Sequence, residues 1–142
     1  MHRLISRLLP LVVLSLIMSG CGNDNIDTPT TTEPGPSTTT KDTFSGVLTL
    51  NGATTYPFTV TGTGLMSALL TTLSPDATKP VGLSLGTWNG RTCQVVIPND
   101  VSIQGSAVVG QSTTTGNFCV RIYDAAGTVV QPQTYTIEVT HQ

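Results

Sequence analysis

The chain has 142 residues and a formal net charge of −2, with six Lys and Arg residues against eight Asp and Glu. No run of basic residues occurs along it. This balance argues against a nucleic-acid partner, because binding to nucleic acid depends on clustered Lys and Arg side chains.

The first twenty residues have the pattern of an export signal. Arg3 and Arg7 give a positively charged start, and an apolar run from Leu8 to Met18 follows. The run is too short to cross a bilayer as a helix, but it has the length of a signal-peptide core. We therefore expect residues 1–20 to be removed on export.

Met18, Ser19 and Gly20 lead directly into Cys21. This order resembles the lipobox of bacterial lipoproteins, which implies that the Cys21 thiol is acylated and that Cys21 begins the mature protein. Two or three acyl chains hold a protein stably on a membrane. The alternative is a chance cysteine after a plain signal. Gly22 stands where the inner-membrane retention signal has Asp, so the resemblance implies a lipid-anchored protein of the cell envelope, sorted to the outer membrane.

Residues 21–41 are expected to form a flexible linker behind the lipidated cysteine. They are rich in Thr, Pro, Asn and Gly, and Ile26 is their only large apolar side chain. Such a segment buries too little apolar surface to order itself. In an extended conformation it would reach roughly 60 Å. Residues 42–142 then remain as a single domain.

Apolar residues recur with a period of two along this domain, which indicates β-strands. Gly, Asn, Asp and Pro clusters separate the runs, as expected for a β-sandwich of short strands. The segment Leu65–Leu70 is apolar at both parities, so a helical turn is possible, but we interpret it as a buried strand. The alternating apolar positions are Phe44, Leu48 and Leu50; Tyr56, Phe58 and Val60; Val81, Leu83 and Leu85; Val95 and Ile97; Phe118, Val120 and Ile122; and Tyr135, Ile137 and Val139.

Cys93 and Cys119 are the cysteines that remain after Cys21. An exported protein lies in a compartment that permits disulfides, so we predict that the two pair. Closing a loop of about 27 residues stabilises a domain by about 3.5 kcal/mol in the chain-entropy model. Cys119 shares the parity of Arg121, which places the bridge on the outer face of a sheet. A metal pair or a redox dithiol is the alternative, but no histidine lies nearby.

The sequence gives little support for catalysis, and we expect neither an enzyme nor a cofactor or metal site. His141 is the only imidazole after the signal. A catalytic base needs firm packing and an orienting partner, whereas His141 is the penultimate residue and continues the inward parity of the last strand. We expect it to cap a sheet edge. The carboxylates Asp76, Asp100 and Asp124 stand alone in turn-like contexts, where turn formation explains them.

Trp88 is the one tryptophan of the chain, and it precedes an Asn-Gly turn and Arg91. These two residues are candidates for a binding site, because an exposed indole stacks on a sugar or on a partner's side chain. The competing interpretation is that Trp88 covers one end of the core.

Two segments resemble the end of bacterial pre-peptidase C-terminal domains. The first reads Gly-Asn-Phe-Cys-Val-Arg-Ile-Tyr-Asp over residues 116–124, and the second reads Gln-Thr-Tyr-Thr-Ile-Glu-Val over residues 133–139. The resemblance extends to the opening of the domain and covers nearly all of residues 43–140. It implies an all-β, jelly-roll-like antiparallel sandwich of about eight strands without catalytic residues.

Three functions follow from this sequence. The first is a non-catalytic envelope lipoprotein that acts as a tethered binding or structural module, with an envelope protein or a glycan as its partner. The second is an inhibitor or accessory subunit of an exported enzyme such as a peptidase, and the third is a carbohydrate-binding module. An exposed, ordered loop around Trp88 would favour binding, and a buried Trp88 would favour a structural role.

Overall fold

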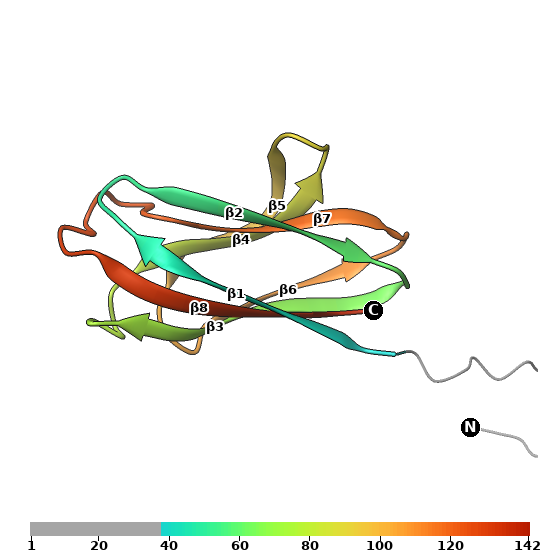
Figure 1. Ribbon diagram of the computed structural model, residues 1–142, viewed down its shortest axis with the longest axis horizontal. Coiled ribbons are helices and arrows are strands. Elements are labelled where there is room, and N and C mark those ends of the chain that lie inside the picture. The colour runs from blue at the N-terminus through green and yellow to red at the C-terminus, as the bar shows by residue number, and fades with distance from the viewer. Residues whose placement is uncertain (1–37) are drawn as a thin grey trace, which may run out of the picture. The chain divides into compact units, whose positions relative to one another are not determined.

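The computed structural model describes residues 38–142, which form two antiparallel sheets of four strands each (Figure 1). The predicted export signal, Cys21 and nearly all of the predicted linker lie outside the described residues. Within residues 38–142, no helix has the length and apolar character needed to span a membrane. The strands are β1 (Thr40–Leu48), β2 (Ala53–Val60), β3 (Gly64–Ser74), β4 (Val81–Trp88), β5 (Cys93–Ser102), β6 (Ala107–Ser112), β7 (Gly116–Tyr123) and β8 (Gln133–His141).

The strand order is that of a jelly roll. One sheet has the order β1-β8-β3-β6, which we call sheet A, and the other has the order β2-β7-β4-β5, which we call sheet B. The pairs β1 with β8, β2 with β7, β3 with β6 and β4 with β5 are nested antiparallel partners. This nesting is how eight strands form two Greek keys in a double-sheet jelly roll. The prediction of an all-β sandwich of about eight strands is confirmed.

The core lies between the two sheets and is built from alternate residues of the strands. In β8, Tyr135, Ile137 and Val139 are buried, whereas the residues between them are partly exposed. Successive side chains of a strand point to opposite faces, so the period-two pattern in the sequence becomes an inner apolar face. The buried apolar set continues through Leu48, Phe58, Val60, Leu70, Leu83, Leu85, Val120 and Ile122.

The segment that is apolar at both parities belongs to a strand, as predicted. Met66, Ala68 and Leu70 in β3 point into the core, whereas Leu65 is 69% exposed. The register of β3 against β8 shifts after Leu70, which marks a β-bulge.

In the middle of the chain, one sequence expectation is wrong and one strand was not predicted. Asp100, which was expected in a turn, lies inside β5, where the pairing with β4 shifts around Asn99. Strand β6 was not predicted at all. Its inward positions are Val108, Gly110 and Ser112, and two small residues out of three leave no apolar period to recognise.

Candidate binding site at the β4–β5 hairpin

The hairpin formed by β4 and β5 leaves the plane of sheet B and projects from the sandwich (Figure 1). The register of β4 against β5 shifts between Leu85 and Gly86, at the point where the projection begins. A Cβ atom on Gly86 would collide with the carbonyl oxygen of Gln94 and would lie 3.0 Å from the Cα atom of Val95. The backbone of β5 therefore crosses directly over Gly86, and this crossing requires glycine.

The tip of the hairpin is held by its own Asn-Gly turn. The side-chain oxygen of Asn89 accepts hydrogen bonds from the backbone N–H groups of Arg91 and Thr92, at 3.0 and 2.9 Å. Its amide nitrogen donates to the Thr92 hydroxyl at 3.0 Å. Gly90 has a φ of 93°, which glycine adopts at little cost. The exposed tip is thus an ordered turn of the Asx type.

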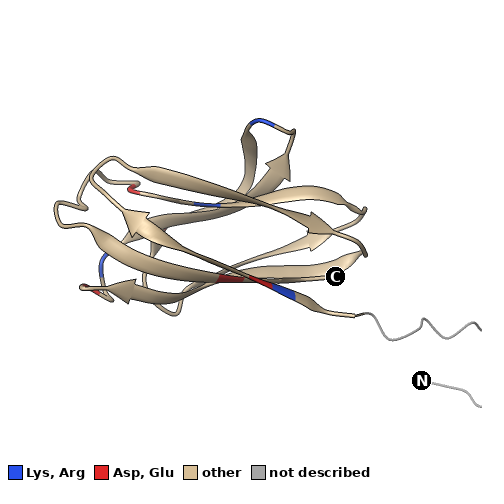
Figure 2. Cartoon of the chain, in the orientation of Figure 1, with Lys and Arg blue, Asp and Glu red and all other residues tan. Residues whose placement is uncertain are grey.

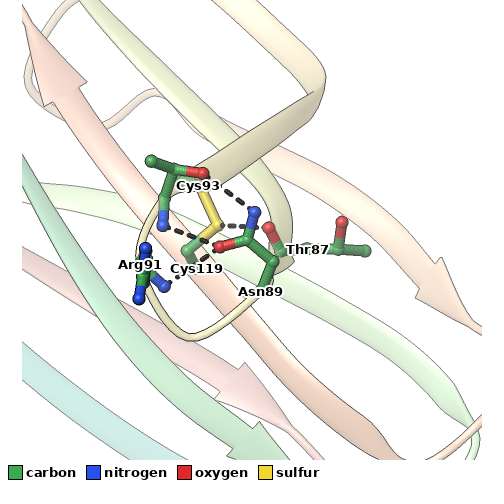
Figure 3. The surroundings of a disulfide bond; sticks show 6 residues. Thr87, Asn89, Arg91, Cys93 and Cys119 are labelled. Atoms are coloured by element: carbon green, nitrogen blue, oxygen red, sulfur yellow. Dashed lines mark hydrogen bonds between the residues drawn. A yellow bond between two sulfur atoms is a disulfide. The ribbon is translucent and has the colours of Figure 1, made fainter.

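A disulfide between Cys93 and Cys119 ties the hairpin to β7 (Figure 3). The two cysteines belong to strands that are separated by β4 in sheet B, yet their Cα atoms are only 5.8 Å apart. The predicted pairing is confirmed, and the bridge lies on the outer face of sheet B, as the parity of Cys119 indicated. The sulfur of Cys119 lies 3.3 Å from the carbonyl oxygen of Thr87. A disulfide sulfur carries no hydrogen, so this is a packing contact.

An open groove lies between the hairpin and the outer surface of β2 and β7. We call it the hairpin groove, and its volume is about 410 Å³. Trp88 lines it and is half-buried, while Arg91 is exposed at the hairpin tip. The structure therefore brings the two predicted binding residues together. The residues that line the groove are Ala53, Thr55, Trp88, Arg91, Thr92, Cys93 and Arg121.

Two guanidinium groups give the hairpin groove a positive charge. Arg91 comes from the hairpin and Arg121 from β7, and no acidic residue is among the described residues that line the groove. Charged residues are sparse in this domain, and Figure 2 shows a basic residue at the hairpin tip. In residues 38–142, the contacts within 4.0 Å between a basic and an acidic side chain join Lys41 to Glu138 and His141 to Asp42 instead. Neither arginine is neutralised by such a pair in the described part of the chain.

Arg121 is positioned by the ring beside it. Its guanidinium carbon lies 5.0 Å from the centre of the Tyr123 ring, which is a cation–π contact. The Tyr123 hydroxyl donates a hydrogen bond to Asp100. Burial, followed by this hydrogen bond, raises the pKa of Tyr123 to about 12. The Tyr123 hydroxyl thus stays protonated well above physiological pH, and its ring contacts Arg121 in the lining of the groove.

A second concave site lies on the other side of the same hairpin. We call it the apolar cleft; it has a volume of about 240 Å³ and opens where the edge strands β5 and β6 of the two sheets meet. Thr87 lines the apolar cleft and its neighbour Trp88 lines the hairpin groove, because adjacent strand residues point to opposite faces. The cleft is lined by Met66, Leu85, Gly86, Thr87, Val96, Ile97, Phe118 and the polar residues Gln111, Ser112, Thr113 and Thr114.

His141 lies away from both concave sites. It is 3% exposed, its ring packs against Phe58 with centroids 5.2 Å apart, and its Nε2 atom lies 3.0 Å from Asp42 of β1. His141 thus occupies an inward position at the end of β8 and joins it to the edge strand, as its parity indicated. It lines neither the hairpin groove nor the apolar cleft.

The carboxylates that were expected in turns have structural partners. Asp76 accepts hydrogen bonds from the hydroxyl and the backbone N–H of Thr78, and these lower its pKa. Burial alone would raise the pKa of Asp124, but hydrogen bonds from backbone N–H groups outweigh it, and the pKa lies below its ordinary value. Asp100 is the exception, because it lies in β5 rather than in a turn. In residues 38–142, no three His, Cys, Asp or Glu side chains gather to hold a metal ion.

Sequence reasoning found the hairpin but missed the floor of the groove. Arg121 was recognised as outward-facing, yet nothing in the sequence placed it opposite Trp88. Thr55 of β2 was missed for the same reason, since both depend on the pairing of β2 with β7 and on the crossing at Gly86. One signal in the sequence could have placed Arg121 in the groove. Cys119 and Arg121 share a parity, so they lie on the same face of their strand, and a disulfide from Cys93 brings the hairpin close to that face.

Solved structures of other proteins share this fold. The Yersinia pseudotuberculosis-derived mitogen matches with a TM-score of 0.53 and 16% identity, over 72% of this chain and 86% of the other. A periplasmic lysozyme inhibitor of g-type lysozyme from Aeromonas hydrophila matches with a TM-score of 0.51 and 12% identity, over 72% and 86%. At these identities the likeness establishes the fold alone. No protein-family model and no curated protein matches the chain, so the pre-peptidase resemblance stays a prediction.

Proposed function

We propose that this protein is a non-catalytic module of the bacterial cell envelope that binds a partner through its β4–β5 hairpin. One observation carries the proposal: an ordered hairpin, fixed by a disulfide, presents Trp88 in an open groove beside two arginines. A tryptophan with a purely structural role would be buried, whereas Trp88 is half-buried and lines the groove. Rigid aromatic anchors with neighbouring arginines are the residues that dominate binding energy at protein interfaces.

The proposed location rests on the amino-terminal sequence. Cys21 follows a signal with a lipobox-like end, and an acylated Cys21 would anchor the domain to the envelope through the linker of residues 21–41. The disulfide supports export, because such bonds persist in oxidising compartments outside the cytoplasm. The fold shared with a periplasmic inhibitor agrees with an envelope protein. Outer-membrane sorting is the finer proposal that Gly22 supports.

A second candidate is an inhibitor of an exported enzyme. The Aeromonas hydrophila protein of similar fold is a lysozyme inhibitor, and a projecting hairpin suits insertion into an enzyme cleft. The test is direct: purified protein is added to g-type lysozyme and to a panel of exported peptidases. Inhibition that Trp88→Ala abolishes would establish this function, and activity unchanged at high protein excess would remove it for the enzymes tested.

The general proposal is tested by crosslinking in living cells, followed by capture from detergent-solubilised envelopes. Wild type is compared with Trp88→Ala and with Leu65→Ala, which truncates a 69% exposed side chain on sheet A. We expect one partner to be recovered with wild type and with Leu65→Ala, and to be lost with Trp88→Ala. Recovery of the same set of proteins with all three variants would contradict a binding role for Trp88. Circular dichroism of each variant checks that the fold is intact.

A further inference from the structure

We infer that the partner is a protein segment that straddles the hairpin, placing a carboxylate in the hairpin groove and an apolar side chain in the apolar cleft. This inference rests on the proposed function and deepens it, because it states what chemistry the partner presents. It depends on three features of the described residues: the uncompensated charge of the groove, the lining of the cleft, and the strand that separates them.

The charge of the hairpin groove selects an anionic group. Arg91 lines it from the turn between β4 and β5 and Arg121 lines it from β7, and the described lining contains no carboxylate. Asp100 accepts the hydrogen bond of the Tyr123 hydroxyl, and it is the Tyr123 ring that contacts Arg121. Guanidinium groups bind carboxylates through paired, charge-assisted hydrogen bonds. An entering carboxylate would meet both arginines beside the indole of Trp88.

The apolar cleft selects a hydrocarbon side chain. Met66, Ile97 and Phe118 line its interior, and the hydroxyl and amide side chains of residues 111–114 contribute to the lining from β6 and the turn that follows it. A dry cavity of roughly 150 Å³ already holds a benzene molecule. At about 240 Å³, this cleft has room for a leucine or phenylalanine side chain of a partner. Val96 extends the apolar lining outward and is 65% exposed.

The position of the two sites favours a protein over a glycan. They lie on opposite sides of one strand, since Thr87 lines the cleft and Trp88 lines the groove. An acidic oligosaccharide supplies anionic groups, but it has no hydrocarbon side chain for the cleft. A polypeptide that crosses the hairpin supplies both groups from nearby residues.

The test is a selection of random short peptides displayed on phage against the purified domain. We expect enriched peptides to combine Asp or Glu with one large apolar residue. Arg91→Gln/Arg121→Gln should abolish the acidic preference and weaken the selected peptides about tenfold or more, as loss of charge-assisted hydrogen bonds implies. Lys41→Gln/Lys79→Gln removes the same amount of charge outside the groove. It should change neither the acidic preference nor the affinity of the selected peptides. Affinity is read from the fluorescence of Trp88, the only tryptophan of the chain.

The cleft is tested with a matched pair of valines in β5. Val96→Ser changes the apolar lining and should abolish the preference for a large apolar residue, whereas Val101→Ser changes a 73% exposed valine outside the cleft and should leave it intact. Two results would overturn the inference. One is an acidic preference that survives Arg91→Gln/Arg121→Gln. The other is the absence of any enriched peptide together with arginine-dependent binding to uronic acid oligosaccharides, which would assign the groove to a glycan.

The outcome can be separated from that of the general proposal. If crosslinked capture depends on Trp88 but is unchanged by Arg91→Gln/Arg121→Gln, the hairpin binds a partner and the carboxylate inference fails. If capture does not depend on Trp88, the proposed binding through the hairpin is itself contradicted.

Discussion

Ser84 is fully buried in the middle of β4, and its hydroxyl oxygen has no hydrogen-bond partner among the described residues. A buried polar group without a partner costs about 1–3 kcal/mol. We therefore predict that Ser84→Ala raises the free energy of unfolding by about 1 kcal/mol, measured by urea denaturation.

Ser112 is the matched control for this prediction. It is also buried, but its hydroxyl donates a hydrogen bond to the carbonyl oxygen of Gly62 at 3.1 Å. Ser112→Ala should therefore lower the free energy of unfolding by about 1 kcal/mol. A loss of stability in Ser84→Ala as large as that in Ser112→Ala would show that the Ser84 hydroxyl is satisfied in solution.

A second prediction at the residue scale concerns Asp124. Its carboxylate accepts hydrogen bonds from the backbone N–H groups of Asn51, Thr128 and Val129, so it joins the turn after β1 to the loop after β7. Burial alone raises its pKa, but these bonds outweigh burial and lower it. A lowered pKa means that the folded state favours the charged form. The stabilisation is therefore complete above the unfolded value of about 3.9 and is lost as the pH falls from there through the lowered folded value.

We expect the stability difference between wild type and Asp124→Asn to be constant near neutral pH. It should shrink as the pH falls below about 4, because wild-type Asp124 then becomes protonated as well. Urea denaturation at a series of pH values measures this difference. A difference that does not change with pH would mean that the charge of Asp124 adds nothing to the hydrogen bonds.

At the scale of the element, a single covalent bond ties the hairpin to β7. Cys93 and Cys119 are 26 residues apart in sequence, and the chain-entropy model gives about 3.5 kcal/mol for a loop of this size. Cys93→Ala/Cys119→Ala should therefore lower the free energy of unfolding by about that amount, and a reductant should destabilise wild type but not the variant.

In the same variant, the hairpin should no longer be held against β7. Arg91 is exposed in the turn, so the peptide bond after it is a site for trypsin. We expect cleavage there to be faster in Cys93→Ala/Cys119→Ala than in wild type, as shown by mass spectrometry of the fragments under native conditions. Equal cleavage rates would indicate that the crossing at Gly86 and the turn at Asn89 hold the hairpin without the disulfide.

Strands that follow a regular alternation were predictable from the sequence, and the elements that depart from it were not. β8 alternates along its whole length, and Leu65–Leu70 was assigned correctly to a strand. β6 was missed because Gly110 and Ser112 stand at inward positions. The hairpin groove was only half predictable: Trp88 and Arg91 stand out in the sequence, but Arg121 meets them through the jelly-roll pairing and the bulge at Gly86.

At the scale of the whole domain, the hairpin groove and the start of the first strand belong to different sheets. β1 begins at Thr40 and pairs with His141 at the end of β8, so the linker side of the domain belongs to sheet A. The hairpin groove lies on the outer face of sheet B. Anchoring through the residues before β1 would therefore leave the hairpin accessible to a partner, and the two functions can be tested independently.

The last prediction concerns the anchor. If Cys21 is acylated, the wild-type protein should partition into the detergent phase and incorporate radiolabelled palmitate, because two or three acyl chains give stable membrane attachment. Cys21→Ser should move the protein to the soluble fraction while leaving the Cys93–Cys119 disulfide and the circular dichroism spectrum unchanged. Cys93→Ala/Cys119→Ala is the control, since it also removes cysteines but should stay with the membrane. Membrane attachment that persists in Cys21→Ser would refute the lipobox interpretation. If attachment is lost and the soluble variant still captures its partner through Trp88, anchoring and binding are separate properties of the chain.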